Sequence, residues 1–260
     1  MPEGDTIHRV AARLRPVLAG RPLVRFEAPR RRGVASAPRP GTTITAVEAV
    51  GKHLLVRFEG GTVLRTHLGM SGSWHLYATG ERWRKPAHLL RALVEVEGWV
   101  AVCFSAPTVE LDRETTAIAH LGPDLTSAAV TDADLDTCVD RMAALVDPGE
   151  AIGVVLLDQR VACGVGNVYK SEVLWACRVD PFAAVGSLPI ETRRQLVATA
   201  AALLRANVDH PGARVTYQGG VAVYGRTGRP CPRCGTAISS RRQGEQARNT
   251  YWCARCQAPG

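Results

Sequence analysis

Apolar side chains near the N-terminus recur with the period of a helix. They stand every three or four residues between positions 5 and 19, at Ile7, Val10, Leu14 and Val17 or Leu18. Such a stripe is typical of an amphipathic helix that packs one face on a core. Asp5 or Thr6 can cap its first turn, because a short polar side chain accepts a hydrogen bond from an N–H group that the helix leaves unpaired. We therefore expect a helix that begins almost at the first residue.

From about residue 21 to residue 104 the pattern changes to that of strands. Leu54, Val56 and Phe58 alternate ahead of a Gly-Gly turn, which is the period of a chain that buries one face of a sheet. Further strand-like runs lie at 73–77, 89–96 and 99–104. Short strands separated by turn residues predict an antiparallel sandwich or barrel, to which the N-terminal helix is attached.

Beyond about residue 131 the pattern is helical. Segments with helical periodicity lie near 131–146, 150–158, 167–177 and 191–207. Pro and Gly clusters at 107–123 and 208–220 separate the regions, and such residues commonly break regular structure at the joins between domains. Strands followed by helices predict a multi-domain chain of the α+β class.

Length and composition fit such a chain. With 260 residues, 46% of them hydrophobic, the chain can bury more than one core. No apolar run approaches the ~18 residues of a membrane span, and the N-terminus lacks the basic and then apolar segment of a secretion signal. We expect a cytoplasmic protein that does not enter a membrane.

Two Cys-x-x-Cys pairs near the C-terminus predict a metal site. Cys231 and Cys234 form the first pair, and Cys253 and Cys256 form the second, with eighteen residues between the pairs. Together they supply the four sulfur ligands of one tetrahedral structural Zn²⁺. A thioredoxin-like redox motif needs only one pair, and disulfides suit a small secreted protein, so zinc is favoured. Four sulfurs leave no position open for substrate, so any reaction must occur elsewhere.

Arginine is concentrated in the same C-terminal region. Between residues 214 and 256 there are eight arginines and one acidic residue, Glu245, which gives a net charge of +7 (8 − 1), whereas the whole chain carries +8. Basic residues gathered on one small domain indicate a polyanionic partner, because contacts with phosphates release counterions. A solvated charged face is the alternative, but such faces usually mix signs. Nucleic acid is the favoured partner.

The sequence begins Met1-Pro2-Glu3. Removal of the initiator methionine would expose Pro2 as a free secondary amine, whereas the nitrogen of an internal proline belongs to an amide and is not nucleophilic. A free α-amino group in a peptide has a pKa of about 7.7–8, so part of it is neutral near pH 7 and can attack a carbonyl-like carbon to form an iminium. Glu3 beside it can transfer protons. Taken alone this signal is weak, because many chains carry proline at the second position.

Six motifs are spread along nearly the whole chain. They are MPEGD at the start, GKHLL at 51–55, HLGMSG at 67–72, LLDQRVACGVGNVYKSEVLW at 156–175, VYGRTGRPC at 223–231 and ARNTYWCARC at 247–256. Together they resemble the formamidopyrimidine-DNA glycosylase and endonuclease VIII family of DNA repair enzymes. The resemblance implies an N-terminal β-sandwich with flanking helices over residues 1–122, a helix-two-turns-helix domain over 123–213 and a zinc finger over 214–260.

The resemblance also implies the roles of single residues. Pro2 matches the nucleophile that attacks C1′ of the damaged nucleotide, and Glu3 matches the general acid that assists opening of the sugar ring. Lys52 matches a lysine on a β-turn that contacts the phosphate beside the lesion, where a cation would also lower the pKa of a neighbouring amine. The implied enzyme removes the base through a Schiff base and then cuts the strand by β,δ-elimination.

Four further residues match DNA contacts of the family. His67, Asn167 and Arg248 match phosphate contacts, and Met70 matches an unbranched side chain that fills the void left by a flipped base. Asn167 follows Gly164-Val165-Gly166, where glycines let the backbone approach an anion and the next helix presents free N–H groups. A core histidine and ordinary core packing are the plain alternatives for His67 and Met70.

The sequence departs from the family's pattern at three places. Thr6 stands where relatives commonly carry glutamate, and residues 106–113 (APTVELDR), expected as a void-filling loop, contain no aromatic side chain. The stretch 208–222 is short for a loop that caps damaged purines. These departures and the MPEGD start favour endonuclease VIII-like specificity for oxidised pyrimidines and abasic sites in double-stranded DNA, and we expect a monomer. A zinc-finger DNA-binding protein that keeps the fold without catalysis is the alternative.

Overall fold

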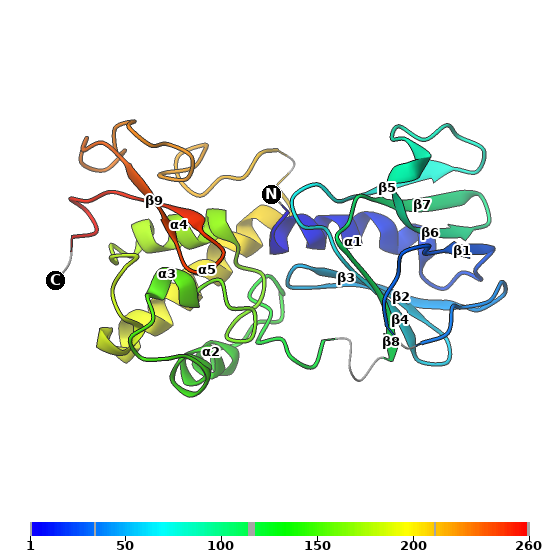
Figure 1. The fold of residues 1–260 in the computed structure, drawn as a ribbon, viewed down its shortest axis with the longest axis horizontal. Helices are drawn as coiled ribbons and strands as arrows, with labels where there is room; N and C mark the ends of the chain where they lie inside the picture. The colour runs from blue at the N-terminus through cyan, green and yellow to red at the C-terminus, as the bar shows by residue number, and fades with distance from the viewer. Residues whose placement is uncertain (1, 34, 114–117, 211, 259–260) are drawn as a thin grey trace. The chain divides into compact units, whose positions relative to one another are not determined.

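The computed structural model describes residues 2–33, 35–113, 118–210 and 212–258. The chain divides into two compact units, residues 1–119 and 120–260, which are considered separately below (Figure 1). Met1, whose removal the predicted chemistry requires, lies outside the described residues. None of the described helices is both long and apolar enough to cross a membrane.

Where the first unit is described, its strands form two four-stranded antiparallel sheets (Figure 1). One sheet has the strand order β1 (Arg25–Glu27), β6 (Leu90–Val96), β7 (Trp99–Phe104) and β5 (Ser73–Ala78). The other has the order β2 (Ile44–Val50), β3 (His53–Phe58), β4 (Thr62–His67) and β8 (Thr108–Arg113). A short 3₁₀ helix, η1 (Ala87–Leu89), precedes β6. Apolar side chains from both sheets enter one shared core, so the predicted β-sandwich is confirmed.

Helix α1 (Gly4–Leu18) packs its apolar stripe on strands β2 and β3. The predicted helix is confirmed, but the predicted cap is wrong. The chain turns into the helix at Glu3, whose backbone is extended and whose side chain makes no capping hydrogen bond. Asp5 already lies inside the first turn, fully buried, with Arg9 3.7 Å away. The Asp5 side chain is therefore buried in the first turn, whereas the sequence indicated that it would cap the helix.

Strands β1, β2 and β8 were not predicted, and β8 overturns an expectation. Residues 106–113 were expected to form a loop, whereas β8 pairs with β4 along its whole length. Val109 and Leu111 alternate with polar neighbours and enter the sandwich core, which gives the segment the period of a half-buried strand. Only the three residues 105–107 then connect β7 to β8.

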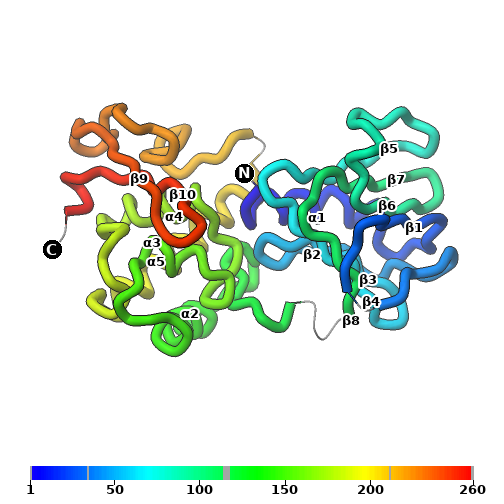
Figure 2. Tube along the Cα trace, in the orientation of Figure 1, coloured from blue at the N-terminus to red at the C-terminus, as the bar shows by residue number. Residues whose placement is uncertain are grey.

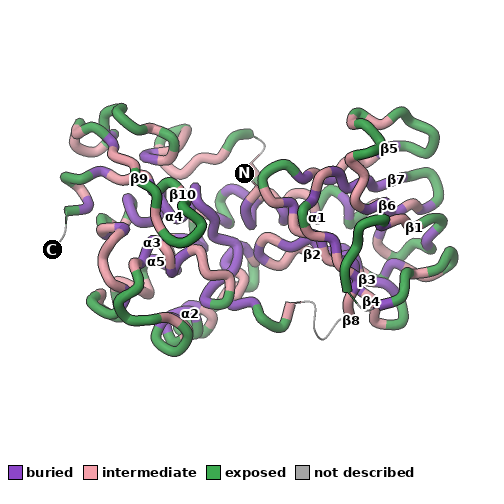
Figure 3. Tube along the Cα trace, in the orientation of Figure 1, coloured by how far each residue is buried: buried purple, intermediate pink, exposed green. Residues whose placement is uncertain are grey.

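The described residues of the second unit form four α-helices, all close to their predicted segments. They are α2 (Asp132–Leu145), α3 (Ile152–Val155), α4 (Asn167–Ala176) and α5 (Ile190–Val208), with a 3₁₀ helix η2 (Val185–Ser187) before α5. Thr131 and Asp134 form a capping box at the start of α2, which explains its sharp N-terminus. Helix α4 is the centre of this unit, because its residues from Asn167 to Trp175 are all buried (Figure 3).

A two-stranded hairpin packs against this central helix. It consists of β9 (Ser239–Gln243) and β10 (Arg248–Trp252), and β10 contacts α4; the trace in Figure 2 shows the two side by side. A small core joins Trp175 of α4 to Val223, Ile238 and two cysteines. The predicted fold class is therefore confirmed: an α+β chain with a sandwich, a helical region and a C-terminal hairpin module.

A buried hydrogen bond links the two sheets of the sandwich and generates a stability prediction. Trp74 Nε1 of β5 donates to Thr66 Oγ1 of β4 over 3.0 Å, and both side chains are buried. Trp74→Phe should lower the free energy of unfolding by about 1–3 kcal/mol, because a buried hydroxyl then loses its donor. Calorimetric melting of the full chain measures this. Trp99→Phe is the matched control, since Trp99 is 38% exposed, and it should change the free energy of unfolding by no more than about 0.5 kcal/mol.

Candidate nucleic-acid interface and metal centre

The N-terminus of α1 holds the proposed nucleophile and acid. Pro2 is half-buried, and Glu3 is fully buried at the entrance to the helix. The Glu3 carbonyl accepts the first helical hydrogen bond, from Ile7 N at 3.1 Å.

The other end of α1 fixes the direction of the helix relative to the sheet. Arg15 Nε donates to the Val47 carbonyl at 2.9 Å, and Gly20 N donates to the Ile44 carbonyl at 2.7 Å. Residue numbers therefore rise along α1 as they fall along β2, so the two elements run antiparallel. The start of α1 and the end of β2 consequently lie at the same end of the sheet.

Lys52 stands at that end of the sheet. The pair Val50 and His53 closes a two-residue hairpin loop between β2 and β3, formed by Gly51 and Lys52. Gly51 has a φ of +54°, as the first loop position of a type II′ turn requires. The tight turn leaves the Lys52 side chain half-exposed, at the same end of the sheet as Pro2 and Glu3.

His67 belongs to the same end of the sheet. It is the last residue of β4 and pairs directly with His53, and the two imidazole centroids lie 5.2 Å apart. Arg65 Nη1 approaches His53 Nδ1 at 3.3 Å, and Arg65 also forms an ion pair with Glu110. Because a guanidinium only donates, His53 Nδ1 is the acceptor in this contact. His67 is half-exposed and is not a core histidine.

Met70 is presented by a tightly held loop between β4 and β5. Its side chain is 78% exposed, so ordinary core packing does not explain it. The neighbouring backbone has little freedom. A Cβ on Gly69, whose φ is +57°, would meet Pro107 Cγ at 2.8 Å, and a Cβ on Gly72 would meet the Leu68 carbonyl oxygen at 2.4 Å. An apolar side chain on a constrained, exposed loop is suited to insertion between bases.

Asn167 is the first residue of α4, at the start of the predicted helical segment. Its Nδ2 donates to the Asn249 carbonyl at 2.8 Å, while its buried Oδ1 accepts no hydrogen bond from any described residue. Gly164 in the preceding loop has a φ of +105°, and a Cβ there would lie 2.6 Å from Thr126 Oγ1. The loop thus depends on glycine both for its backbone conformation and for its close packing.

Arg248 begins β10 immediately before Asn249. Its side chain is half-exposed, and its Nε donates to Gln246 Oε1 at 3.2 Å. The hydrogen bond from Asn167 to Asn249 brings the start of α4 to the start of β10, although 82 residues separate the two partners. Within this unit the structure therefore brings Asn167 and Arg248 together, as it brings Lys52 and His67 together in the first unit.

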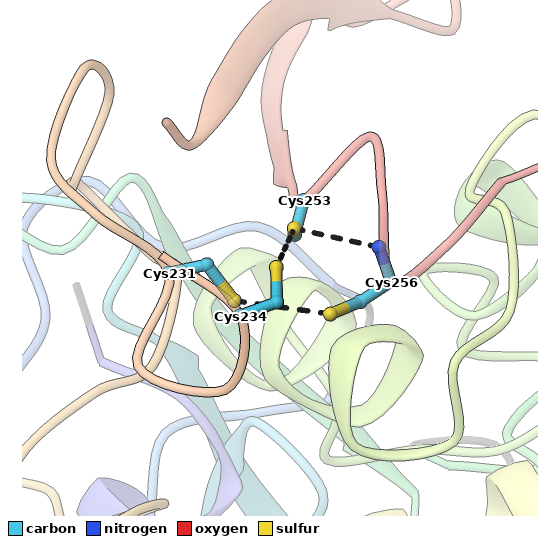
Figure 4. Close-up of side chains that lie close together, drawn as sticks. All are labelled: Cys231, Cys234, Cys253 and Cys256. Atoms are coloured by element: carbon cyan, nitrogen blue, oxygen red, sulfur yellow. Dashed lines mark hydrogen bonds between the residues drawn. The ribbon is translucent and has the colours of Figure 1, made fainter. Parts of the chain in front are cut away.

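The four predicted cysteines form one cluster. Their sulfur atoms all lie within 4.8 Å of one another (Figure 4), with 4.0 Å between those of Cys231 and Cys256 and 3.5 Å between those of Cys234 and Cys253. A tetrahedral zinc site with bonds of about 2.3 Å needs sulfur–sulfur separations of about 3.8 Å. Trp175 Nε1 also donates to Cys231 Sγ at 3.4 Å, in the manner of groups that orient metal ligands. The cluster fits Zn²⁺.

The ionisation of these thiols also favours a bound cation. Hydrogen bonds from the side chain and backbone of Thr236 lower the pKa of Cys234 to about 6. Burial, followed by the neighbouring sulfurs, raises the pKa of Cys256 to about 12. Four thiolates this close together repel one another, so all four can be charged only when a cation lies among them.

Two charged residues in α4 were missed by the sequence reasoning. Lys170 and Glu172 are each 1% exposed. The Glu172 carboxylate accepts hydrogen bonds from three consecutive backbone N–H groups at 2.7–2.9 Å, those of Ala222, Val223 and Tyr224. The available signal was a pair of charges in a segment that is otherwise nearly apolar. Such charges are rarely buried unless they are hydrogen-bonded.

Three family profiles match successive segments of the chain. The formamidopyrimidine-DNA glycosylase N-terminal domain matches residues 1–109, and the formamidopyrimidine-DNA glycosylase H2TH domain matches 121–218. The zinc finger found in FPG and IleRS matches residues 228–259, and this segment contains all four clustered cysteines.

Named relatives match nearly the whole length of the chain. It is 43% identical over 268 residues to probable endonuclease 8 2 of Streptomyces coelicolor, covering 99% of this chain and 94% of the relative. It is 38% identical over 266 residues to DNA-(apurinic or apyrimidinic site) lyase Nei2 of Mycolicibacterium smegmatis, covering 99% of each. Among solved structures, the MutM (Fpg) protein from Thermus thermophilus is similar with a TM-score of 0.80 and 30% identity, covering 100% of both chains. On these matches, the chain belongs to the formamidopyrimidine-DNA glycosylase and endonuclease VIII family.

Proposed function

We propose that the protein is a bifunctional DNA glycosylase and abasic-site lyase of base excision repair that uses Pro2 as its nucleophile. The observation that carries this proposal is the arrangement at one end of the sandwich. Pro2 and Glu3 precede α1 at this end. Because α1 and β2 run antiparallel, the turn that contains Lys52 lies at the same end. The printed names of the relatives, an endonuclease 8 and an abasic-site lyase, support the same reaction.

The proposed reaction begins once Met1 is removed. The neutral amine of Pro2 attacks C1′ of the damaged nucleotide, the N–C1′ bond forms, and the bond to the base breaks. Glu3 protonates the sugar oxygen as the ring opens, which leaves an iminium between Pro2 and C1′. Loss of a proton from C2′ then expels the 3′ phosphate, and a second elimination expels the 5′ phosphate. Lys52, as a nearby cation, favours the neutral amine of Pro2 and attracts the flanking phosphate.

DNA binding is proposed to use both units. His67 and Lys52 contact phosphates from the first unit, and Asn167 and Arg248 contact them from the second. The cluster of Cys231, Cys234, Cys253 and Cys256 would hold one Zn²⁺, which supplies folding energy to the hairpin module and no step of the reaction. The proposal includes a monomeric enzyme and the domain ranges 1–122, 123–213 and 214–260.

Oxidised pyrimidines and abasic sites are the proposed substrates in double-stranded DNA. Support comes from the short β7–β8 connection, because three residues cannot form a second void-filling loop of the kind expected for purine lesions. Met70 is then the exposed apolar side chain of this region that can replace a flipped base.

The proposed nucleophile can be tested by trapping the iminium. Borohydride should trap wild-type protein on abasic-site DNA, and Pro2→Gly should lower the trapped fraction and the rate of strand cutting by about a thousandfold. Pro40→Gly is the matched control, since Pro40 is an exposed loop proline, and it should trap normally. Intact mass must first show that Met1 is absent. A Pro2→Gly band of undiminished strength would exclude Pro2, and a wild-type protein that binds DNA but cuts no lesion would favour the non-catalytic alternative.

Zinc removal should abolish DNA binding and cutting together. Metal analysis should find one zinc ion per chain in the wild type and none in Cys253→Ser, because a three-sulfur site loses most of its affinity. Cys177→Ser is the control, since Cys177 lies outside the cluster and is half-buried, and it should keep the metal. If cutting continues after the zinc has been shown to be gone, the hairpin does not need the metal to hold Arg248.

Lesion preference is tested with a panel of single-lesion duplexes. Thymine glycol, dihydrouracil and an abasic site should be cut faster than 8-oxoguanine. Met70→Ala should slow removal of the pyrimidine lesions by about tenfold, because stabilisation of the flipped state is lost, with a smaller effect at preformed abasic sites. Val24→Ala, at another exposed apolar side chain of the same unit, should leave all rates unchanged. A preference for 8-oxoguanine would contradict the proposed specificity.

A further inference from the structure

Helix α4 carries a buried ammonium group at its centre. Lys170 is 1% exposed, and its Nζ donates to Thr250 Oγ1 of β10 at 2.7 Å. Thr250 is itself fully buried. A buried charge is costly unless it is hydrogen-bonded, and it is rarely the most stable choice for a core position. Lys170 therefore contributes through the groups that its hydrogen bond holds in place.

The ammonium sets the direction of a chain of hydrogen bonds. Since lysine only donates, the Thr250 hydroxyl must accept from it and pass its own proton onward. It donates to Gln243 Oε1 at 2.7 Å, which fixes the orientation of that amide, and Gln243 Nε2 donates to the Pro181 carbonyl at 2.9 Å. We call Lys170, Thr250 and Gln243 the relay. It joins α4, both strands of the hairpin and the segment that follows α4.

The relay contacts the hairpin next to Arg248. Gln243 is the direct cross-strand partner of Arg248. Thr250 is two residues further along β10, so its side chain lies on the same face of the hairpin as that of Arg248. Lys170, Gln243 and Arg248 also line one groove of about 590 Å³. The relay thus holds the strand opposite the arginine at Gln243, and the arginine's own strand at Thr250, two residues further along.

We propose that Lys170 is a positioning residue for Arg248, acting through Thr250 and Gln243 to hold the arginine where it meets a DNA phosphate. This inference rests on the proposed role of Arg248 in DNA binding. Without the ammonium, the Thr250 hydroxyl loses its donor, and its own proton is no longer directed toward Gln243 alone. The hairpin can then shift relative to α4, and the contact with phosphate weakens although no DNA-contacting group has been removed.

Salt dependence of DNA binding separates positioning from stability. Lys170→Met keeps the length and apolar stem of the side chain and removes the charge. Its affinity for a duplex with an uncleavable abasic-site analogue should fall about tenfold, and the slope of log K against log salt should fall by about 0.9, the value of one phosphate contact. Thr250→Val, which breaks the relay at its second member, should do the same and replaces Lys170→Met if that variant fails to fold.

A double-mutant cycle tests the connection to Arg248. Arg248→Ala should lower the salt slope by the same amount, and adding Lys170→Met to it should cause little further loss. Val197→Ala, a cavity in the core of α5, controls for stability and should lower the melting temperature with the slope unchanged. Additive losses, or an unchanged slope in Lys170→Met and Thr250→Val, would overturn the relay. If Arg248→Ala binds like the wild type, the role of Arg248 fails, and this inference fails with it.

Discussion

The attachment of the β9–β10 hairpin to helix α4 is the interaction on which the second unit depends. A buried helix offers few places where a small, arginine-rich hairpin can be held by apolar contact alone. The structure holds it with hydrogen bonds from Asn167 and Lys170, which reach the adjacent β10 residues Asn249 and Thr250. Glu172 accepts three further hydrogen bonds, from the backbone N–H groups of residues 222–224, which precede the hairpin. These polar contacts are buried or partly buried. Each is directional, and together they define one register of hairpin on helix.

The cysteine cluster and the α4 contacts act on opposite ends of the same hairpin strand. Cys253 follows the C-terminal end of β10, whereas Arg248 begins it. A metal among the four sulfurs would fix the far end of the strand, and the contacts with α4 fix the near end. The Arg248 side chain gains from both in any contact with an anion, because a side chain whose backbone is already ordered loses less entropy on binding. The basic charge of the region provides attraction, and the scaffold provides position.

The first unit holds the N-terminal residues of the chain in place. Terminal residues are commonly poorly ordered unless something ties them down. Here α1 begins at Gly4 and packs on β2 and β3, so Glu3 is buried only two residues after the terminus of the sequence. The same packing orients the start of the helix toward the Lys52 turn. The sandwich thus holds the first residues of the chain in a fixed position.

Local pattern in the sequence was sufficient for much of this protein. The period of apolar residues located α1, β3, β5, β6, β7 and all four helices of the second unit, and cysteine spacing selected the cluster, because these signals depend only on near neighbours. The pattern failed at β8, whose strand character depends on pairing with β4, and at the cap of α1, where burial of Asp5 outweighs the capping preference. It also passed over Lys170 and Glu172. Their partners lie about 50 or 80 residues away, so the sequence determined most of the elements and the cysteine cluster, whereas only the tertiary structure decided which buried charges hold the hairpin in place.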